Sequence, residues 1–101
     1  MAKIGSKTLS VIPSESPDVV GYKLYVETST SELTYDSESF DLGTQTSVDL
    51  SSIPALLSKD GVFHIGITAV DDAGNESDMS VVMNVPLDFQ APLPPIGVSI
   101  Q

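Results

Sequence analysis

The chain of 101 residues contains no cysteine, no tryptophan and no arginine. Without cysteine, a disulfide framework and thiolate metal sites are excluded, while the redox compartment stays open. Four lysines stand against fourteen acidic residues, which gives a net charge of −10. Such a surface repels phosphates, so nucleic acid and anionic membranes are excluded as partners. The acidity is consistent with simple solubility, and cations, basic partners and neutral sugars remain open.

Long hydrophobic runs are also lacking. No apolar stretch approaches the roughly 18 residues that cross a bilayer, so no membrane insertion is expected. No basic-then-apolar N-terminus indicates a signal peptide, and Met1-Ala2-Lys3 is typical of an expressed fragment whose leader has been removed. A hydrophobic content of 41% in 101 residues predicts one globular domain.

The stretch from residue 62 to residue 85 is the most regular part of the sequence. Two sets of side chains alternate with a period of two: Phe63, Ile65, Ile67 and Ala69 on one face, and His64, Gly66, Thr68 and Val70 on the other. This alternation predicts a strand with one face on a core. Turn formers at 71–75 interrupt it, and a second apolar run follows at 81–85. Together they predict a hairpin.

Shorter segments between turn-forming residues complete the prediction. Strands are expected at 8–12, 20–27 and 46–50, and a loop with a short edge strand at 28–43. One short helical turn is expected near residues 53–58. Ser52 would cap it, Pro54 suits its first turn, and Gly61 would follow its end.

The predicted fold class is all-β, an antiparallel two-sheet β-sandwich of six to seven strands with one short helical turn. Both inner faces would contribute to a single core. The predicted core consists of the inward members of each strand: Leu9, Val11, Tyr22, Leu24, Val26, Val48, Leu50, Phe63, Ile65, Ile67, Ala69, Val81, Met83 and Val85.

Residues 87–101 differ in kind from the rest of the chain. Three prolines in Ala91–Pro95 predict a stiff, extended spacer. Beyond it, Ile96, Val98 and Ile100 alternate with small or polar residues, which predicts a strand without a sheet of its own. We therefore expect the sandwich at 1–86, and a proline-rich linker with the first strand of a following repeat at 87–101.

Four segments carry a further indication. The residues VVGYKLYV at 19–26 and ITAVDDAGNES at 67–77 occur together with LSVIP at 9–13 and PLPPIGVSI at 92–100. In order and spacing they resemble bacterial fibronectin type III domains. Residues 19–26 match the third strand of that family, and residues 67–77 match its sixth strand with the following loop. Residues 9–13 match the second strand, and residues 92–100 match the opening of a following repeat. The resemblance covers residues 8–85 and implies an immunoglobulin-like sandwich.

The chain departs from this family in three places. Val11 stands where the family has tryptophan, so a large core anchor is missing. Phe63 replaces a tyrosine whose hydroxyl ties down the adjoining loop. Only seven residues precede Thr8, too few for a first strand and its turn. A stub at 1–7, or the tail strand of a neighbouring molecule in a domain swap, would fill that place.

One acidic loop is the candidate metal site. It groups five residues with the hard oxygen ligands that calcium prefers: Asp71, Asp72, Asn75, Glu76 and Asp78. Their spacing does not match an EF-hand, and ordinary turn chemistry explains the same residues. We expect no cofactor, with calcium as the weaker alternative. Asn75-Glu76-Ser77 also reads as a glycosylation sequon, which the family's loop signature explains equally well.

No enzymatic activity is predicted. The single histidine supplies neither a catalytic triad nor a zinc site. Carboxylate pairs such as Glu38 with Asp41, or Asp71 with Asp72, have the chemistry of a glycosidase. Nothing in the sequence indicates the burial that would raise the pKa of one member.

The predicted binding face lies on the outward side of two strands and consists of Lys23, Tyr25, His64 and Thr68. A tyrosine there would stack on a sugar or a peptide. The resemblance implies a monomeric structural spacer between neighbouring domains of a larger secreted or cell-surface protein. One alternative is an adhesion module that binds carbohydrate or protein through this face or through loops. Another is an accessory domain of a polysaccharide-degrading enzyme.

Overall fold

The structure is a computed structural model that describes residues 7–89 and 91–100, so the predicted stub at 1–7 lies, except for Lys7, outside the described residues. The strands are β1 (Thr8–Ser10), β2 (Val19–Thr28), β3 (Glu38–Gly43), β4 (Ser47–Asp49), β5 (Asp60–Asp71) and β6 (Ser80–Asp88). Two short 3₁₀ turns, η1 (Leu50–Ser52) and η2 (Pro54–Ser58), join β4 to β5. The prediction of a mostly β chain is confirmed. Within the described part of the chain, no helix has the length and apolarity that crossing a bilayer requires.

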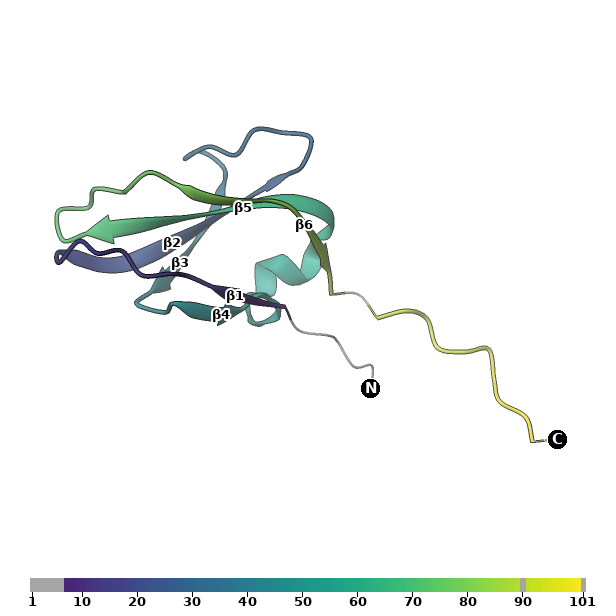
Figure 1. The fold of residues 1–101 in the computed structure, drawn as a ribbon. Helices are drawn as coiled ribbons and strands as arrows, with labels where there is room; N and C mark the ends of the chain where they lie inside the picture. The colour runs from purple at the N-terminus through teal and green to yellow at the C-terminus, as the bar shows by residue number, and fades with distance from the viewer. Residues whose placement is uncertain (1–6, 90, 101) are drawn as a thin grey trace.

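The strands form two antiparallel sheets (Figure 1). β1 pairs with β4, and the larger sheet has the order β3-β2-β5-β6. β2 and β5 are the long central strands, and their ladder runs from Val19 opposite Asp71 to Thr28 opposite Phe63. Their β-branched and aromatic residues suit a pleated surface that is covered on both sides. β5 also pairs antiparallel with β6, so the predicted hairpin is present as these two strands.

Side chains from both sheets meet in one apolar core. Leu24 of β2, Ile65 of β5 and Leu50 of η1 are almost completely buried there. Seven predicted core residues are buried: Tyr22, Leu24, Val26, Val48, Leu50, Phe63 and Ile65. Five more pack against them while partly exposed: Leu9, Val11, Ile67, Ala69 and Val85. The core prediction is thus confirmed for both central strands.

The core prediction is wrong for the first half of β6. Val81 is 44% exposed and Met83 is 59% exposed. The cause is a bulge: Phe63 lies opposite Val85, but Ile65 lies opposite Val82, so β6 has an extra residue. Asn84 takes a left-handed conformation with φ of 57° at this point. The extra residue reverses the alternation, and Val81 and Met83 leave the core face.

The core extends further along the chain than predicted. Leu87 pairs with Gly61 across the β5–β6 ladder and is fully buried, and Phe89 is 6% exposed. Leu42 and Leu56 are also buried, although the sequence pattern did not single them out. The packed body therefore continues past residue 86 as far as Phe89.

The predicted helical turn is present as two 3₁₀ turns, with a different cap. Asp49 is the capping residue of η1, and its carboxylate accepts a hydrogen bond from the Ser51 backbone at 3.0 Å. The turn predicted at 53–58 corresponds to η2, whose capping residue is Ile53 without a side-chain hydrogen bond, so the prediction of Ser52 as the cap is wrong. The hydroxyl of Ser52 donates instead to the Asp49 carbonyl at 2.6 Å. Pro54 begins η2, where its missing N–H costs nothing.

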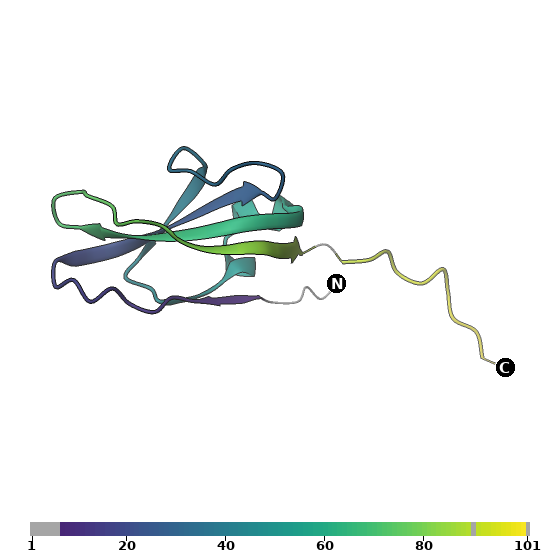
Figure 2. The ribbon, with the colours of Figure 1, turned by 45° about the horizontal axis from the view of Figure 1, so that its top comes forward.

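Residues 91–100 form an extended tail without strand pairing. It leads away from the two sheets in both views (Figures 1 and 2). Leu93, Ile96, Val98 and Ile100 are each more than 90% exposed. The strand predicted after the prolines is therefore extended, but among the described residues it joins neither sheet.

Candidate functional site

The outer face of the larger sheet is covered rather than open to solvent. Tyr25 is 1% exposed, Thr68 is 0% exposed and His64 is 6% exposed. These three side chains lie on the outward side of the sheet, but they are buried there. Lys23 is the member of the predicted binding face that stays partly exposed. The alternation of β2 and β5 identified the two faces correctly, but it does not reveal what lies over the second face.

Two loops provide this cover. The loop between β2 and β3 contributes Tyr35, whose ring meets the Tyr25 ring edge-on with 5.9 Å between centroids. It also contributes Leu33, which lies with Met79 directly over Gly66. A Cβ atom on Gly66 would sit only 2.2 Å from the Met79 sulfur. Gly66 therefore leaves the space in which the two loops meet above the sheet.

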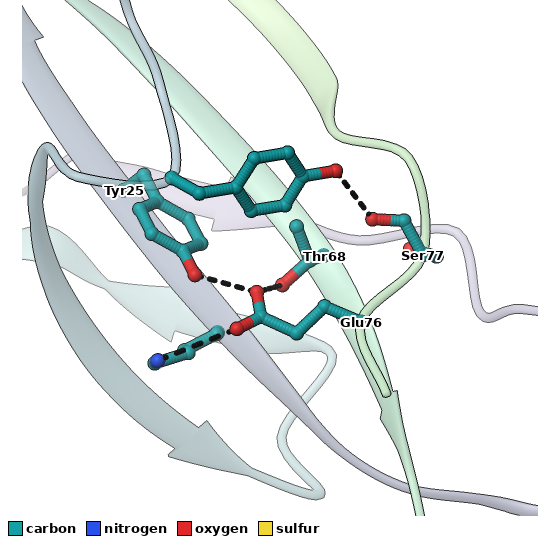
Figure 3. Close-up of polar contacts among 6 residues, drawn as sticks. Tyr25, Thr68, Glu76 and Ser77 are labelled. Atoms are coloured by element: carbon teal, nitrogen blue, oxygen red, sulfur yellow. Dashed lines mark hydrogen bonds and ion pairs between the residues drawn. The ribbon is translucent and has the colours of Figure 1, made fainter. Parts of the chain in front are cut away.

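Glu76 is the centre of a polar cluster beneath this cover. Its Oε2 accepts hydrogen bonds from the Tyr25 hydroxyl at 2.5 Å and from the Thr68 hydroxyl at 2.8 Å. Its Oε1 lies 3.5 Å from the Lys23 amine. Figure 3 shows the carboxylate turned inward between the side chains of Tyr25 and Thr68. We call Lys23, Tyr25, Thr68 and Glu76 the Glu76 cluster.

The electrostatics of the Glu76 cluster favour a fixed pattern of charge. Hydrogen bonds from Tyr25 and then Thr68 lower the pKa of Glu76. Burial raises the pKa of the Tyr25 hydroxyl, and its bond to Glu76 adds to the effect. The nearby Glu76 carboxylate raises the pKa of Lys23. The cluster thus holds an anion, a neutral phenol and a cation near pH 7, and it contains no group ready to exchange a proton.

The residue after Glu76 fixes the loop to both of its neighbours. The Ser77 carbonyl accepts a hydrogen bond from the Tyr35 hydroxyl at 2.8 Å (Figure 3). The Ser77 amide donates to the Ala69 carbonyl at 2.9 Å, and the Ala69 amide donates to the Ser77 hydroxyl at 2.9 Å. These bonds hold the segment before β6 alongside the end of β5.

His64 is occupied by the bulge in β6. Its Nδ1 accepts a hydrogen bond from the Asn84 amide at 3.2 Å. An imidazole nitrogen that accepts a hydrogen bond carries no proton of its own at that position. Asn84 is the residue with positive φ, so the histidine satisfies a backbone donor that the bulge removes from the ladder. This contact gives His64 a structural role.

The five predicted calcium ligands do not converge. Asp71 accepts hydrogen bonds from the backbone amides of Ala73 at 3.0 Å and Asn75 at 2.8 Å, and from the Asn75 side chain at 3.0 Å. These bonds lower the pKa of Asp71, with the Asn75 side chain as the largest cause. Glu76 turns away to the sheet, while Asp72 and Asp78 are exposed. Among residues 7–89 and 91–100, no group of three or more acidic or histidine side chains is placed to hold a metal.

The other carboxylate pair is also divided between separate partners. Glu38 forms an ion pair with Lys59 at 2.6 Å. Asp41 accepts a hydrogen bond from the Gly43 amide at 2.8 Å, in the turn that ends β3. The two carboxyl groups therefore contact different partners and do not form the facing pair of a general acid and a general base.

Comparison with protein-family models gives no match, and no curated protein or solved structure gives a significant match.

Replacing Glu76 with glutamine is expected to make stability less sensitive to acid. A carboxyl group with a lowered folded-state pKa contributes fully above the unfolded-state pKa of about 4.3, and loses its contribution as the pH falls through the folded-state pKa. Between about pH 6 and pH 3, the natural chain should therefore lose more free energy of unfolding than Glu76→Gln. Urea titrations across this range measure the difference. Asp49 and Asp71, whose pKa values are also lowered, remain in both proteins and cancel. Equal acid sensitivity would contradict the Glu76 contacts.

Gly66→Ala is expected to lower the free energy of unfolding by about 1–3 kcal/mol, because the new methyl group displaces Met79 and Leu33 from the sheet. Thermal or urea unfolding measures this loss. The matched control is the double variant Gly66→Ala/Met79→Ala, which removes the two closest atoms, both of Met79, and leaves Leu33 Cδ2 at 2.9 Å. Its loss should be smaller than the sum of the two single losses. Simple additivity would mean that Met79 does not lie over Gly66.

Proposed function

We propose that the chain is a non-catalytic β-sandwich module of the fibronectin type III kind, which acts as a structural spacer in a larger secreted or cell-surface protein. The observation that carries the proposal is the arrangement of a compact two-sheet body followed by an extended, proline-rich tail. The order β3-β2-β5-β6 beside β1-β4 is consistent with the resemblance in the sequence. The tail continues from β6 and carries no charge in residues 91–100.

The use of the polar residues supports a structural role. Three side chains could in principle take part in catalysis or binding: Glu76, Thr68 and His64. Each of them forms hydrogen bonds to other residues of the fold. No side-chain polar atom buried in the described residues lacks a partner. A catalytic or binding site commonly leaves such groups directed at a ligand. Here they hold loops onto a sheet.

Binding through the Tyr25 face is the competing function, and the cover over that face argues against it. Tyr25 has Tyr35 against its ring and Glu76 on its hydroxyl, so a sugar would have to displace both. We therefore assign Tyr25 to the fold. Contacts with neighbouring domains would then occur at the ends of the body, where the tail leaves it (Figure 1).

The spacer function is tested by the stiffness of the tail. The chain has no natural cysteine, so spin labels on Thr44→Cys and Ile96→Cys report one distance between body and tail. A spacer predicts a narrow distribution of distances, because stacked prolines favour an extended conformation. In the matched control, Pro92, Pro94 and Pro95 are replaced by glycine, and the distribution should broaden markedly. A natural chain as broad as the glycine variant would overturn the spacer proposal.

A further inference from the structure

A groove lies between the free edges of the two sheets. Among the described residues, β1 pairs only with β4 and β6 pairs only with β5, so each has one open edge. The space between them has a volume of about 440 Å³. Its lining is mainly apolar, with Leu9 and Val11 on one wall, Ile65 and Ile67 on the floor, and Val82 on the other wall. Val82 is 53% exposed there.

The open edge of β1 has backbone groups that a further strand would pair with. On the β4 side, the Lys7 carbonyl accepts from the Leu50 amide at 2.8 Å and the Val11 amide donates to Thr46 at 2.6 Å. In an antiparallel ladder, hydrogen-bonded residues alternate with residues that turn the other way. The amide and carbonyl groups of Thr8 and Ser10 are therefore directed away from β4. Such an edge is a template for another strand.

The tail has the properties of a strand that suits this edge. Ile96, Val98 and Ile100 occur at every second position, so an extended chain places all three on one face. Each is at least 96% exposed. Residues 91–100 contain no charged side chain, although the whole chain has a net charge of −10. An uncharged apolar segment is the part of one molecule that can approach another without electrostatic repulsion.

The direction of the chain indicates that the tail comes from a second molecule. The Lys7 amine donates to the Pro86 carbonyl, so β1 begins beside the end of β6. The tail leaves from this same end of the body (Figure 1). To reach β1 of its own molecule, it would have to reverse within Ala91–Pro95 and then run parallel to β1. Stacked prolines resist such a reversal, and the tail of another copy approaches antiparallel without one.

We infer that residues 96–100 of one molecule add to the open edge of β1 in a second copy as an antiparallel strand, with Ile96, Val98 and Ile100 in the groove. Backbone hydrogen bonds along β1 would provide pairing, and the three apolar side chains would provide register. The donor tail and the acceptor groove are different surfaces, so the contact is head-to-tail. The assembly keeps one unoccupied groove at one end and one unengaged tail strand at the other, so it grows with concentration.

The test is sedimentation of the full chain over a concentration series, beside two charge variants of the tail. The natural chain should associate as concentration rises. Val98→Asp, which puts a carboxylate into the groove, should weaken association by about tenfold to a hundredfold or more. Gly97→Asp adds the same charge on the opposite face, where nothing lies within 4 Å, and should leave association nearly unchanged.

Three results would overturn the inference. One is a natural chain that stays monomeric up to millimolar concentration. Another is association that Val98→Asp and Gly97→Asp weaken equally, because the effect would then be one of charge alone. The third is a monomer in which the amides of residues 96–100 are protected from hydrogen exchange, because the tail would then pack on its own body. A free peptide of residues 92–101 should dissociate the assembly, and its failure to do so would also count against a tail-in-groove contact.

Discussion

Tyr25→Ala is expected to lower the free energy of unfolding by about 3–5 kcal/mol, the loss typical of a large buried aromatic side chain. Tyr25 is 1% exposed on the outer face of the central sheet. Its ring contacts Tyr35, and its hydroxyl donates to Glu76 beside Thr68. Removing the ring therefore opens a cavity under the cover and leaves the Glu76 carboxylate without its main donor.

Urea unfolding monitored by circular dichroism measures the effect, and two variants serve as controls. Tyr25→Phe keeps the ring and should lose about 1–2 kcal/mol, because one hydrogen bond to a charged acceptor is removed. Tyr35→Ala removes a ring that is 53% exposed and should cost less than Tyr25→Ala. A fully folded Tyr25→Ala with unchanged stability would restore Tyr25 as an exposed candidate for ligand binding.

Leu87→Ala is expected to lower the free energy of unfolding by about 2–5 kcal/mol. Leu87 has no exposed surface and belongs to the same core as Leu24, Leu50 and Phe63. Deleting its isobutyl group leaves a cavity at the end of β6, which lies where the body gives way to the tail. The loss should appear as a lower urea midpoint with an unchanged dependence on urea concentration.

Leu93→Ala is the matched control, since the same substitution falls six residues later on a side chain that is 92% exposed. Its effect should stay within about 0.5 kcal/mol. The pair of variants locates the end of the folded body between residues 87 and 93. Two equally small effects would mean that the folded body ends before Leu87, as the proline-rich composition suggested.

The sequence predicted those features that depend on local periodicity. Alternation in β2 and β5 identified the strands and most of their inward residues, because a half-buried strand repeats every two residues. It could not reveal the bulge at Asn84, since one extra residue changes the register without an apolar pattern to mark it. Val81 and Met83 were therefore assigned to the core although they are exposed.

The second layer over the larger sheet could not be predicted from the strands alone. Leu33 and Tyr35 lie in a polar stretch without periodicity, and Met79 lies between the acidic loop and β6. Their contacts with Gly66 and Tyr25 join residues that are far apart in the chain. One indication was available: a glycine within an alternating strand often marks close approach of another segment, as Gly66 does here.

The acidic loop shows why composition alone misleads at a candidate metal site. Five carboxylate or amide side chains lie within eight residues, but Asp71 accepts hydrogen bonds from the turn and Glu76 accepts them from the sheet. Both uses follow from ordinary hydrogen bonding by short polar side chains and by a carboxylate near hydroxyl donors. The inward direction of Glu76 depends on the fold, because Tyr25 and Thr68 come from neighbouring strands β2 and β5.

We propose that the polar residues of the outer face act on one another rather than on a ligand. A double-mutant cycle of Tyr25→Phe and Glu76→Gln, with unfolding measured at pH 7, tests it most directly. We expect a coupling free energy of about 1–3 kcal/mol, because each substitution removes the same charged hydrogen bond. Additive losses would show that the two side chains act independently. They would contradict the proposed role of Glu76, which is to hold its loop onto the outer face of the larger sheet.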